Sequence, residues 1–248
     1  MKIKNKIREC LIRIISSRNR LKYNYLRFAT FLSTRGIPPP FVPTVVNAVK
    51  RWEKQGLEGE GIPAAYLRED NSIFELFKDI LPYLENDDPL LEIGCNAGRS
   101  LNYLYAKGYK NLTGIEIGQQ AIEEMKKHFP CAYNHCRIFI GNAPSIIRNF
   151  KEGEFSLVFC HSVLVNIHPD QNKIFKEIAR VSNKFILILE NEGSYLAFPR
   201  DFKNIFERYG FKMILSKVFR GGCTSFPIPF KDDDYYNNNT IRLFVKKL

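Results

Sequence analysis

The sequence has few of the features that mark secreted or membrane-spanning proteins. Its six cysteines include no Cys-x-x-Cys pair, and without a secretory signal a disulfide framework is not expected. No stretch approaches the roughly 20 consecutive apolar residues that a transmembrane helix needs. Arg8, Glu9 and Arg13 interrupt the N-terminal apolar residues, which breaks the apolar core of a signal peptide. We therefore expect an intracellular, cytoplasmic protein.

Acidic residues are almost absent from the first 36 residues, which hold ten Lys or Arg and a single acid, Glu9. This segment carries +9 of the formal charge of +11, so residues 37–248 carry only +2. Enzymes that act on RNA usually spread basic charge around the active cleft, and the nearly neutral body argues against that class. The 248 residues suffice for one domain with a sizeable core and an extension.

Residues 2–32 are predicted to form a basic amphipathic helix. Apolar residues recur along one face at helical spacing, and basic residues project from the other. They are Ile3, Ile7, Leu11, Ile14 and Ile15 on the first face and Lys2, Lys6, Arg13 and Arg20 on the second. Such a helix can lie in an anionic membrane interface. Docking on the body or on a partner, and binding to a nucleic-acid backbone, would use the same pattern, and nucleic acid is the least favoured of the three.

Glycine and proline divide the chain into three parts. We expect a basic helical arm over residues 1–36, N-terminal helices with a linker or lid over 37–88, and the main domain over 89–248. The break after the arm is the run Gly36-Ile-Pro-Pro-Pro40. Helices are predicted over 44–55 and 72–84, with a glycine-rich connection or lid at 56–63 between them.

From Leu90 onward, short apolar runs alternate with helical patterns, which predicts a parallel sheet covered by helices on both faces. The expected strands are 90–94, 112–116, 136–140, 155–160, 185–189, 211–218 and 240–246. The expected helices are 97–107, 119–128, 144–150, 169–180 and 200–209. The last two strands have no helical pattern between them, so they can pair as an antiparallel hairpin.

The stretch PLLEIGCNAGRSLNYLY, residues 89–105, reads as a buried strand, a glycine-containing turn and the start of a helix. Such a turn exposes backbone N–H groups at a helix N-terminus, and its glycines allow a ligand to approach the backbone closely. A nicotinamide-type G-x-G-x-x-G fingerprint would need glycines at 94, 96 and 99. Asn96 and Arg99 occupy two of these positions, so that fingerprint fails.

The spacing Glu92-x-Gly94-x-Asn96-x-Gly98 resembles motif I of the class I S-adenosylmethionine (SAM)-dependent methyltransferases, with Asn96 in place of the middle glycine. Asn tolerates left-handed backbone better than most residues. The resemblance covers residues 90–248. It implies a three-layer, Rossmann-like α/β fold with a seven-stranded, mostly parallel sheet and an antiparallel last strand, here with an N-terminal helical extension. It also implies SAM as the cofactor, bound by Glu92, Gly94, Cys95, Asn96, Gly98, Glu116, Ile117, Asn142 and Ala143.

Glu116 ends the second predicted strand, at the sheet edge where such folds bind ligands. A carboxylate there can accept both ribose hydroxyls of a nucleoside, which suits NAD and SAM equally. The alternative is a solvated acid favoured by the dipole of the next helix. Asn142 stands in Gly141-Asn142-Ala143, where the family has Gly-Asp-Ala beside adenine. Asn142 can accept from the adenine amine, but it could also serve as a helix cap.

His161 is the candidate catalytic base, because it lies at the carboxyl end of the fourth predicted strand and an imidazole can take a proton from a hydroxyl. A packing or cofactor-contacting role for His161 is the alternative. The segment lacks the Asn-Pro-Pro-Tyr type of motif associated with methylation of planar amino groups, which favours an oxygen acceptor. His168 precedes Pro169 and is expected to serve the turn, with a role as the base as the less favoured alternative. The residues His128, Cys131, His135 and Cys136 lack the clear ligand pairs of a zinc site, so no metal is expected.

We therefore expect a SAM-dependent methyltransferase that acts on an oxygen of a small molecule or of a glycan or lipid-linked acceptor, cytoplasmic and in peripheral contact with a membrane if the arm binds one. An RNA methyltransferase that uses the arm on phosphates is one alternative, and its binding would fall steeply with salt. A non-catalytic partner protein of the same fold is another. The sequence does not specify the acceptor or the oligomeric state.

Overall fold

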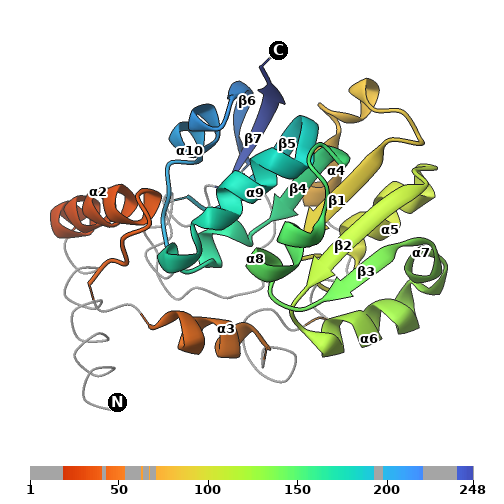
Figure 1. Ribbon diagram of the computed structural model, residues 1–248, viewed down its shortest axis with the longest axis horizontal. Coiled ribbons are helices and arrows are strands. Elements are labelled where there is room, and N and C mark those ends of the chain that lie inside the picture. Colours follow the sequence, from red (N-terminus) through yellow and green to blue (C-terminus); the bar gives the residue numbers. More distant parts are fainter. Residues whose placement is uncertain are drawn as a thin grey trace.

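The computed structural model describes residues 19–40, 43–53, 63, 67, 71–192, 198–219 and 239–247. Their centre is a seven-stranded sheet with the order β3-β2-β1-β4-β5-β7-β6, flanked by helices (Figure 1). The strands are β1 (Pro89–Ile93), β2 (Asn111–Glu116), β3 (Arg137–Ile140), β4 (Phe155–His161), β5 (Ser182–Glu190), β6 (Phe211–Phe219) and β7 (Asn239–Lys246). The first five are parallel, whereas β7 is antiparallel to both β5 and β6. The predicted fold class and the predicted pairing of the last two strands are confirmed.

The helices agree with the sequence pattern except in two places. They are α2 (Asn19–Thr34), α3 (Val45–Glu53), α4 (Asn71–Phe77), α5 (Arg99–Ala106), α6 (Gln119–His128), α7 (Pro130–His135), α8 (Ala143–Ile146), α9 (Lys173–Val181) and α10 (Phe202–Arg208). The helix predicted over 72–84 is wrong in extent. It ends at Phe77, and a separate 3₁₀ turn, Leu81–Tyr83, contains Pro82, which has no N–H to continue a helical ladder. The short helix α7 was not predicted.

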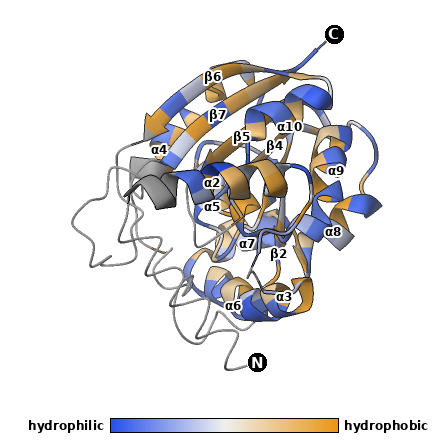
Figure 2. Ribbon diagram, turned by 90° about the vertical axis from the view of Figure 1, so that its left-hand side faces the viewer, coloured by the Kyte–Doolittle hydropathy of each residue, from blue (hydrophilic) through white to orange (hydrophobic). Residues whose placement is uncertain are grey.

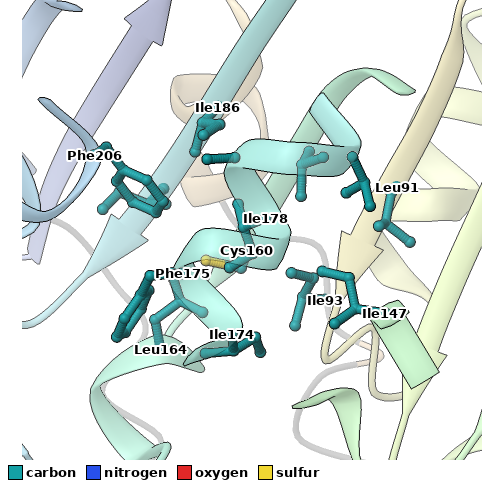
Figure 3. Close-up of a cluster of buried hydrophobic side chains, with 14 of the residues drawn as sticks. Leu91, Ile93, Ile147, Cys160, Leu164, Ile174, Phe175, Ile178, Ile186 and Phe206 are labelled. Carbon is teal, nitrogen blue, oxygen red and sulfur yellow. The ribbon is translucent and has the colours of Figure 1, made fainter. Parts of the chain in front are cut away.

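Both faces of the sheet are buried, as parallel sheets require. Side chains alternate along β1, so that Leu91 and Ile93 face α8, α9 and α10 while Leu90 faces α4, α5, α6 and α7. Figure 3 shows the first of these clusters, in which Ile174 and Phe175 of α9 pack over the strands. The two cores fix the carboxyl ends of β1, β2 and β4 at one edge of the sheet.

The helices α2 and α3 lie outside the layers that cover the sheet (Figures 1 and 2). The side chains of Leu26, Ala29 and Ser33 in α2 are buried against the body, whereas Phe28 and Phe31 are 51% and 52% exposed. The helix predicted over residues 2–32 is thus confirmed from residue 19 and ends at Thr34. Residues 1–18 and most of the glycine-rich connection at 56–63 lie outside the described residues. In the described part of the chain, no helix is long and apolar enough to cross a membrane.

Candidate active site

A pocket lies at the carboxyl edge of the sheet, between the ends of β1, β2, β3 and β4 and the helix α3. Its walls come from the turns after these four strands and from the side of α3 that faces them. Nine of the ten site residues predicted from the sequence line it: Glu92, Gly94, Cys95, Asn96, Glu116, Ile117, Asn142, Ala143 and His161. Residues up to 69 positions apart in the chain therefore meet at one site.

The turn between β1 and α5 forms the floor of this pocket. Gly94, Asn96 and Gly98 have φ values of 72°, 47° and 77°, all in the left-handed region. A side chain at Gly94 would place its Cβ 2.5 Å from Val163 Cγ2, so only glycine fits there. Asn96 accepts the left-handed conformation, and its Oδ1 accepts a hydrogen bond from the N–H of Ala97 at 2.7 Å. The departure from the family's middle glycine is therefore accommodated locally.

Gly98 is the predicted site residue that does not line the pocket. It is the N-cap of α5, and a Cβ there would lie 2.5 Å from the Sδ atom of Met125 in α6. The absence of a side chain lets the start of α5 pack closely on α6. Gly98 thus allows α5 to start close to α6, directly after the turn. Its contact with a cofactor stays a prediction.

Glu116 joins the two turns that flank the pocket. Its Oε2 accepts from the N–H of Asn96 and its Oε1 from the N–H of Gly118, both at 2.8 Å. The residue is 9% exposed, and burial raises its pKa. A carboxylate has about four acceptor positions, so two hydroxyl groups can still bind to it. This arrangement differs from that of a solvated acid at a helix start, because Glu116 is buried and faces the pocket.

Glu92 is the second buried carboxyl group of the pocket. It is 3% exposed, and its Oε2 has no hydrogen-bond partner. Burial raises its pKa to about 8, against the opposing effects of Ser100 and Arg99. A buried carboxyl oxygen without a partner, at the wall of a cavity, suits a cationic ligand group. Among the residues that the structure describes, no group of three or more His, Cys, Asp or Glu is placed to hold a metal ion.

Asn142 follows β3 and stands at the N-cap position of α8. Its side chain makes no capping hydrogen bond, although its backbone oxygen accepts from the N–H groups of Ser145 and Ile146. The interpretation of Asn142 as a simple helix cap is therefore not supported. Asn142 and Ala143 both line the pocket.

The two histidines after β4 have different surroundings. His161 ends β4, is partly exposed and lines the pocket. His168 also lines the pocket but is only 3% exposed; its Nδ1 accepts from the N–H of Asp170, and its Nε2 lies 3.0 Å from the carbonyl oxygen of Pro43. Because Nδ1 accepts, Nε2 carries the proton and donates to Pro43. Burial lowers the pKa of His168, so this neutral form is favoured. The prediction that His168 serves the turn is confirmed.

Sequence reasoning missed the contribution of α3 to the pocket. Ala48, Val49 and Trp52 line the wall opposite the strands, and Asn166 and Gln171 join them from the segment after β4. The apolar periodicity of residues 45–52 indicated a buried face of α3. It could not indicate that this face lies over a ligand pocket.

Comparisons with known proteins agree with this geometry. Residues 91–184 match the family model of a methyltransferase domain. A chain from the complex of the Haloferax volcanii Trm112 methyltransferase activator with a methyltransferase has a TM-score of 0.59 at 12% identity, over 83% of this chain and 98% of that one. Magnesium protoporphyrin IX methyltransferase from Synechocystis, with bound S-adenosylhomocysteine, has a TM-score of 0.54 at 11% identity, over 82% and 96%. Phosphoethanolamine N-methyltransferase 2 from Haemonchus contortus has a TM-score of 0.58 at 13% identity, over 85% and 62%.

No curated protein sequence matches the chain. The fold and the family match together define the class: the chain carries a SAM-dependent methyltransferase domain with the class I fold. The low identities to the solved structures leave the methyl acceptor to be argued from this chain's own residues.

Proposed function

We propose that this methyltransferase transfers the methyl group of SAM to a hydroxyl group of a small molecule or of a glycan or lipid-linked acceptor. The observation that carries the proposal is the position of two buried carboxyl groups, Glu92 and Glu116, in one pocket that His161 and the apolar side chains Ala48, Val49 and Trp52 also line.

The residues at the strand ends fit the cofactor. The unpartnered Oε2 of Glu92 would face the cationic methionine end above the turn at Gly94, and Glu116 would accept the ribose hydroxyls. Asn142 would receive the adenine amine. When bound, SAM supplies a methyl group that its sulfonium makes electrophilic. Cys95, Asn96, Ile117 and Ala143 would complete the cofactor half of the site.

The other half of the pocket offers an acceptor both apolar surface and hydrogen-bonding groups. Val49 and Trp52 of α3 offer the apolar surface, Glu53 of the same helix adds a carboxyl group, and Asn166 and Gln171 offer neutral hydrogen-bonding groups. His161 would take the hydroxyl proton as the oxygen becomes bonded to the methyl carbon. The remaining contribution of the protein is to align the acceptor and to exclude water, effects worth up to roughly 7–11 kcal/mol.

A methyl-transfer assay with SAM labelled on its methyl group tests this function. We expect label in hydroxyl-bearing small molecules, glycans or lipids, in a product that resists mild alkali as an ether does. Label in RNA, with binding that weakens steeply as salt rises, would instead favour the alternative of an RNA methyltransferase. Binding of SAM without transfer to any of these pools would favour a non-catalytic partner protein.

We propose further that α2 and the basic residues before it contact an anionic membrane surface. The proposal is supported by the +9 charge of residues 1–36 and by the exposed rings of Phe28 and Phe31, with the guanidinium of Arg35 stacked 3.7 Å from the Phe31 ring. An acceptor embedded in such a membrane would then be presented near the pocket.

Replacing Phe28 and Phe31 together by Asp should reduce co-sedimentation with anionic vesicles by at least about tenfold, because apolar burial is lost and two negative charges are added. Phe74→Asp is the matched control, since Phe74 is 55% exposed on α4, outside the arm. Equal losses in both variants, or equal binding to uncharged vesicles, would contradict the membrane proposal.

A further inference from the structure

The segment after β4 forms the acceptor side of the pocket and begins with a strained residue. Ser162 has a φ of 59°, which is unusual for a residue with a side chain. The following residues form a 3₁₀ turn, Leu164–Asn166, and we call residues 162–167 the post-β4 turn. Val163, Asn166 and Ile167 of this turn line the pocket, and Val163 packs directly on Gly94. Strained backbone of this kind persists only where the surrounding structure holds it.

Glu190, at the end of β5, binds the N–H groups of the post-β4 turn. Its Oε1 accepts from Val163 and Leu164 at 2.8 Å each, and its Oε2 accepts from Val165 at 3.3 Å. The residue is fully buried. Its carboxyl group therefore takes the place that a capping side chain would have at the start of a helical turn.

Arg200 binds the carbonyl groups of the same turn. Its guanidinium donates to the carbonyl oxygen of Leu164 at 2.9 Å and to that of Ile167. Arg200 is 1% exposed, and all of its side-chain hydrogen bonds in the described structure go to carbonyl or amide oxygens rather than to a carboxylate. A guanidinium buried in this way is costly unless its fixed fork of donors is used, and here the fork spans both ends of the turn.

Arg200 also connects the post-β4 turn to the N-terminal segment. Its Nε and one terminal nitrogen donate to Asn172 Oδ1 at 3.3 and 3.0 Å, which orients the amide so that Asn172 Nδ2 donates to the carbonyl of Ser33 at 2.7 Å. The next residue, Asp201, donates its N–H to Thr34 Oγ1 at 3.0 Å. Hydrogen bonds thus connect the end of α2 to the segment that follows the post-β4 turn, and α3 begins at Val45, after ten further residues.

We propose that Glu190 and Arg200 are positioning residues for methyl transfer. Glu190 binds the N–H groups of the post-β4 turn and Arg200 binds its carbonyl groups, an arrangement that we call the clamp. Arg200 also connects the turn, through Asn172, to Ser33 near the end of α2. The inference rests on the proposed function only for its catalytic consequence, because the clamp itself is a statement about local order. Asn166 lies within the clamped turn and His161 directly precedes it, so we infer that the clamp keeps both in place toward the acceptor, while Glu116 and Asn142 are held by other elements.

Hydrogen exchange on the full chain tests the clamp without any ligand. We expect peptides from residues 162–172 to exchange at least about tenfold faster in both Glu190→Gln and Arg200→Lys, while peptides from β1 and β2 change less than about twofold. Peptides from residues 31–39 should exchange faster in Arg200→Lys and in Asn172→Ala but not in Glu190→Gln. Arg208→Lys, at the exposed end of α10, is the matched control and should match the parent. Uniform acceleration over the sheet, or none at 162–172, would overturn the proposal.

For catalysis, we expect both substitutions to impair the reaction with the acceptor but not the binding of SAM. With a hydroxyl acceptor from the transfer assay, kcat/KM for the acceptor should fall about 10- to 100-fold in both variants, as expected for misplacement by about 1 Å. The Kd for SAM should stay within about threefold, which a generally destabilised protein would not show. A parallel loss of SAM affinity would overturn the positioning role. If the unmodified protein transfers no methyl group, only the proposed function is refuted. The hydrogen-exchange result would still show whether Glu190 and Arg200 order the post-β4 turn.

Discussion

Replacement of His161 by Ala is expected to lower kcat by about 10²- to 10⁴-fold and to leave the Kd for SAM nearly unchanged. The side chain of His161 stands at the end of β4, directly before the post-β4 turn, and lines the pocket. A hydroxyl oxygen must lose its proton as it bonds to the methyl carbon, and the described part of the pocket offers His161 as the group best suited to take it. Steady-state rates of methyl transfer, together with calorimetric titration of SAM, measure the two effects separately.

His128→Ala serves as the control, because His128 lies at the end of α6 and does not line the pocket. It should retain the parent rate. A rate in His161→Ala within about threefold of the parent would remove His161 as the base and would favour an acceptor that needs none.

Binding of SAM at pH 7 is expected to release close to one proton from Glu92. In the empty pocket, burial raises the pKa of Glu92 to about 8, so the group is mostly protonated at neutral pH. A cationic ligand beside it favours the carboxylate and lowers this pKa. The affinity for SAM should therefore rise with pH up to about 8, by as much as about tenfold per pH unit. Calorimetry at pH 7 in buffers of different ionisation enthalpy counts the released proton directly.

Glu92→Gln should release no proton and should bind SAM with an affinity that is nearly independent of pH. The folding stability of the unliganded parent should depend on pH in the opposite direction from its affinity for SAM. The raised pKa of Glu92 means that the folded state holds the proton more tightly than the unfolded state. Its stability should fall as the pH rises from about 4.5 to 8, by roughly 1.4 kcal/mol per pH unit from Glu92. Burial also raises the pKa of Glu190 to about 7, so Glu190 makes the stability fall further as the pH rises toward 7. This contribution should remain in Glu92→Gln. Equal proton release in parent and variant would assign the proton to another group.

The part of the pocket at the strand ends, where we propose that SAM binds, was largely predictable from the sequence because its determinants are local. The turn from Glu92 to Gly98 is one short segment, and Glu116 ends a strand whose apolar pattern fixes its place beside β1. Gly94, Asn96 and Gly98 have left-handed backbone, which favours Gly and Asn, so the turn can be recognised from its residue types. Because β1, β2 and β3 are parallel neighbours, their carboxyl ends lie at the same edge of the sheet, so the strand pattern alone predicts that these residues meet.

The part formed by α3 and the post-β4 turn, where we propose that the acceptor binds, was not predictable to the same degree because it depends on contacts between distant segments. Trp52 comes from α3, and Arg200 reaches the post-β4 turn from 33 residues beyond Ile167. An isolated arginine after Phe198-Pro199 carries no pattern that distinguishes a surface charge from a fully buried one. The error at α4 has a local cause, since apolar spacing continued through Leu81 and concealed the break that Pro82 requires.

Calorimetric titration of the full chain with SAM, in the parent and in Glu116→Ala, is the decisive test of a cofactor site at the strand ends. We expect one site in the parent and at least about tenfold weaker binding in the variant, because hydrogen bonds to a charged group are worth about 1.5–3 kcal/mol each. Glu152→Ala, at an exposed position away from the pocket, should bind like the parent. No binding by the folded parent, or equal affinity in Glu116→Ala, would contradict a cofactor site at the carboxyl edge of this sheet.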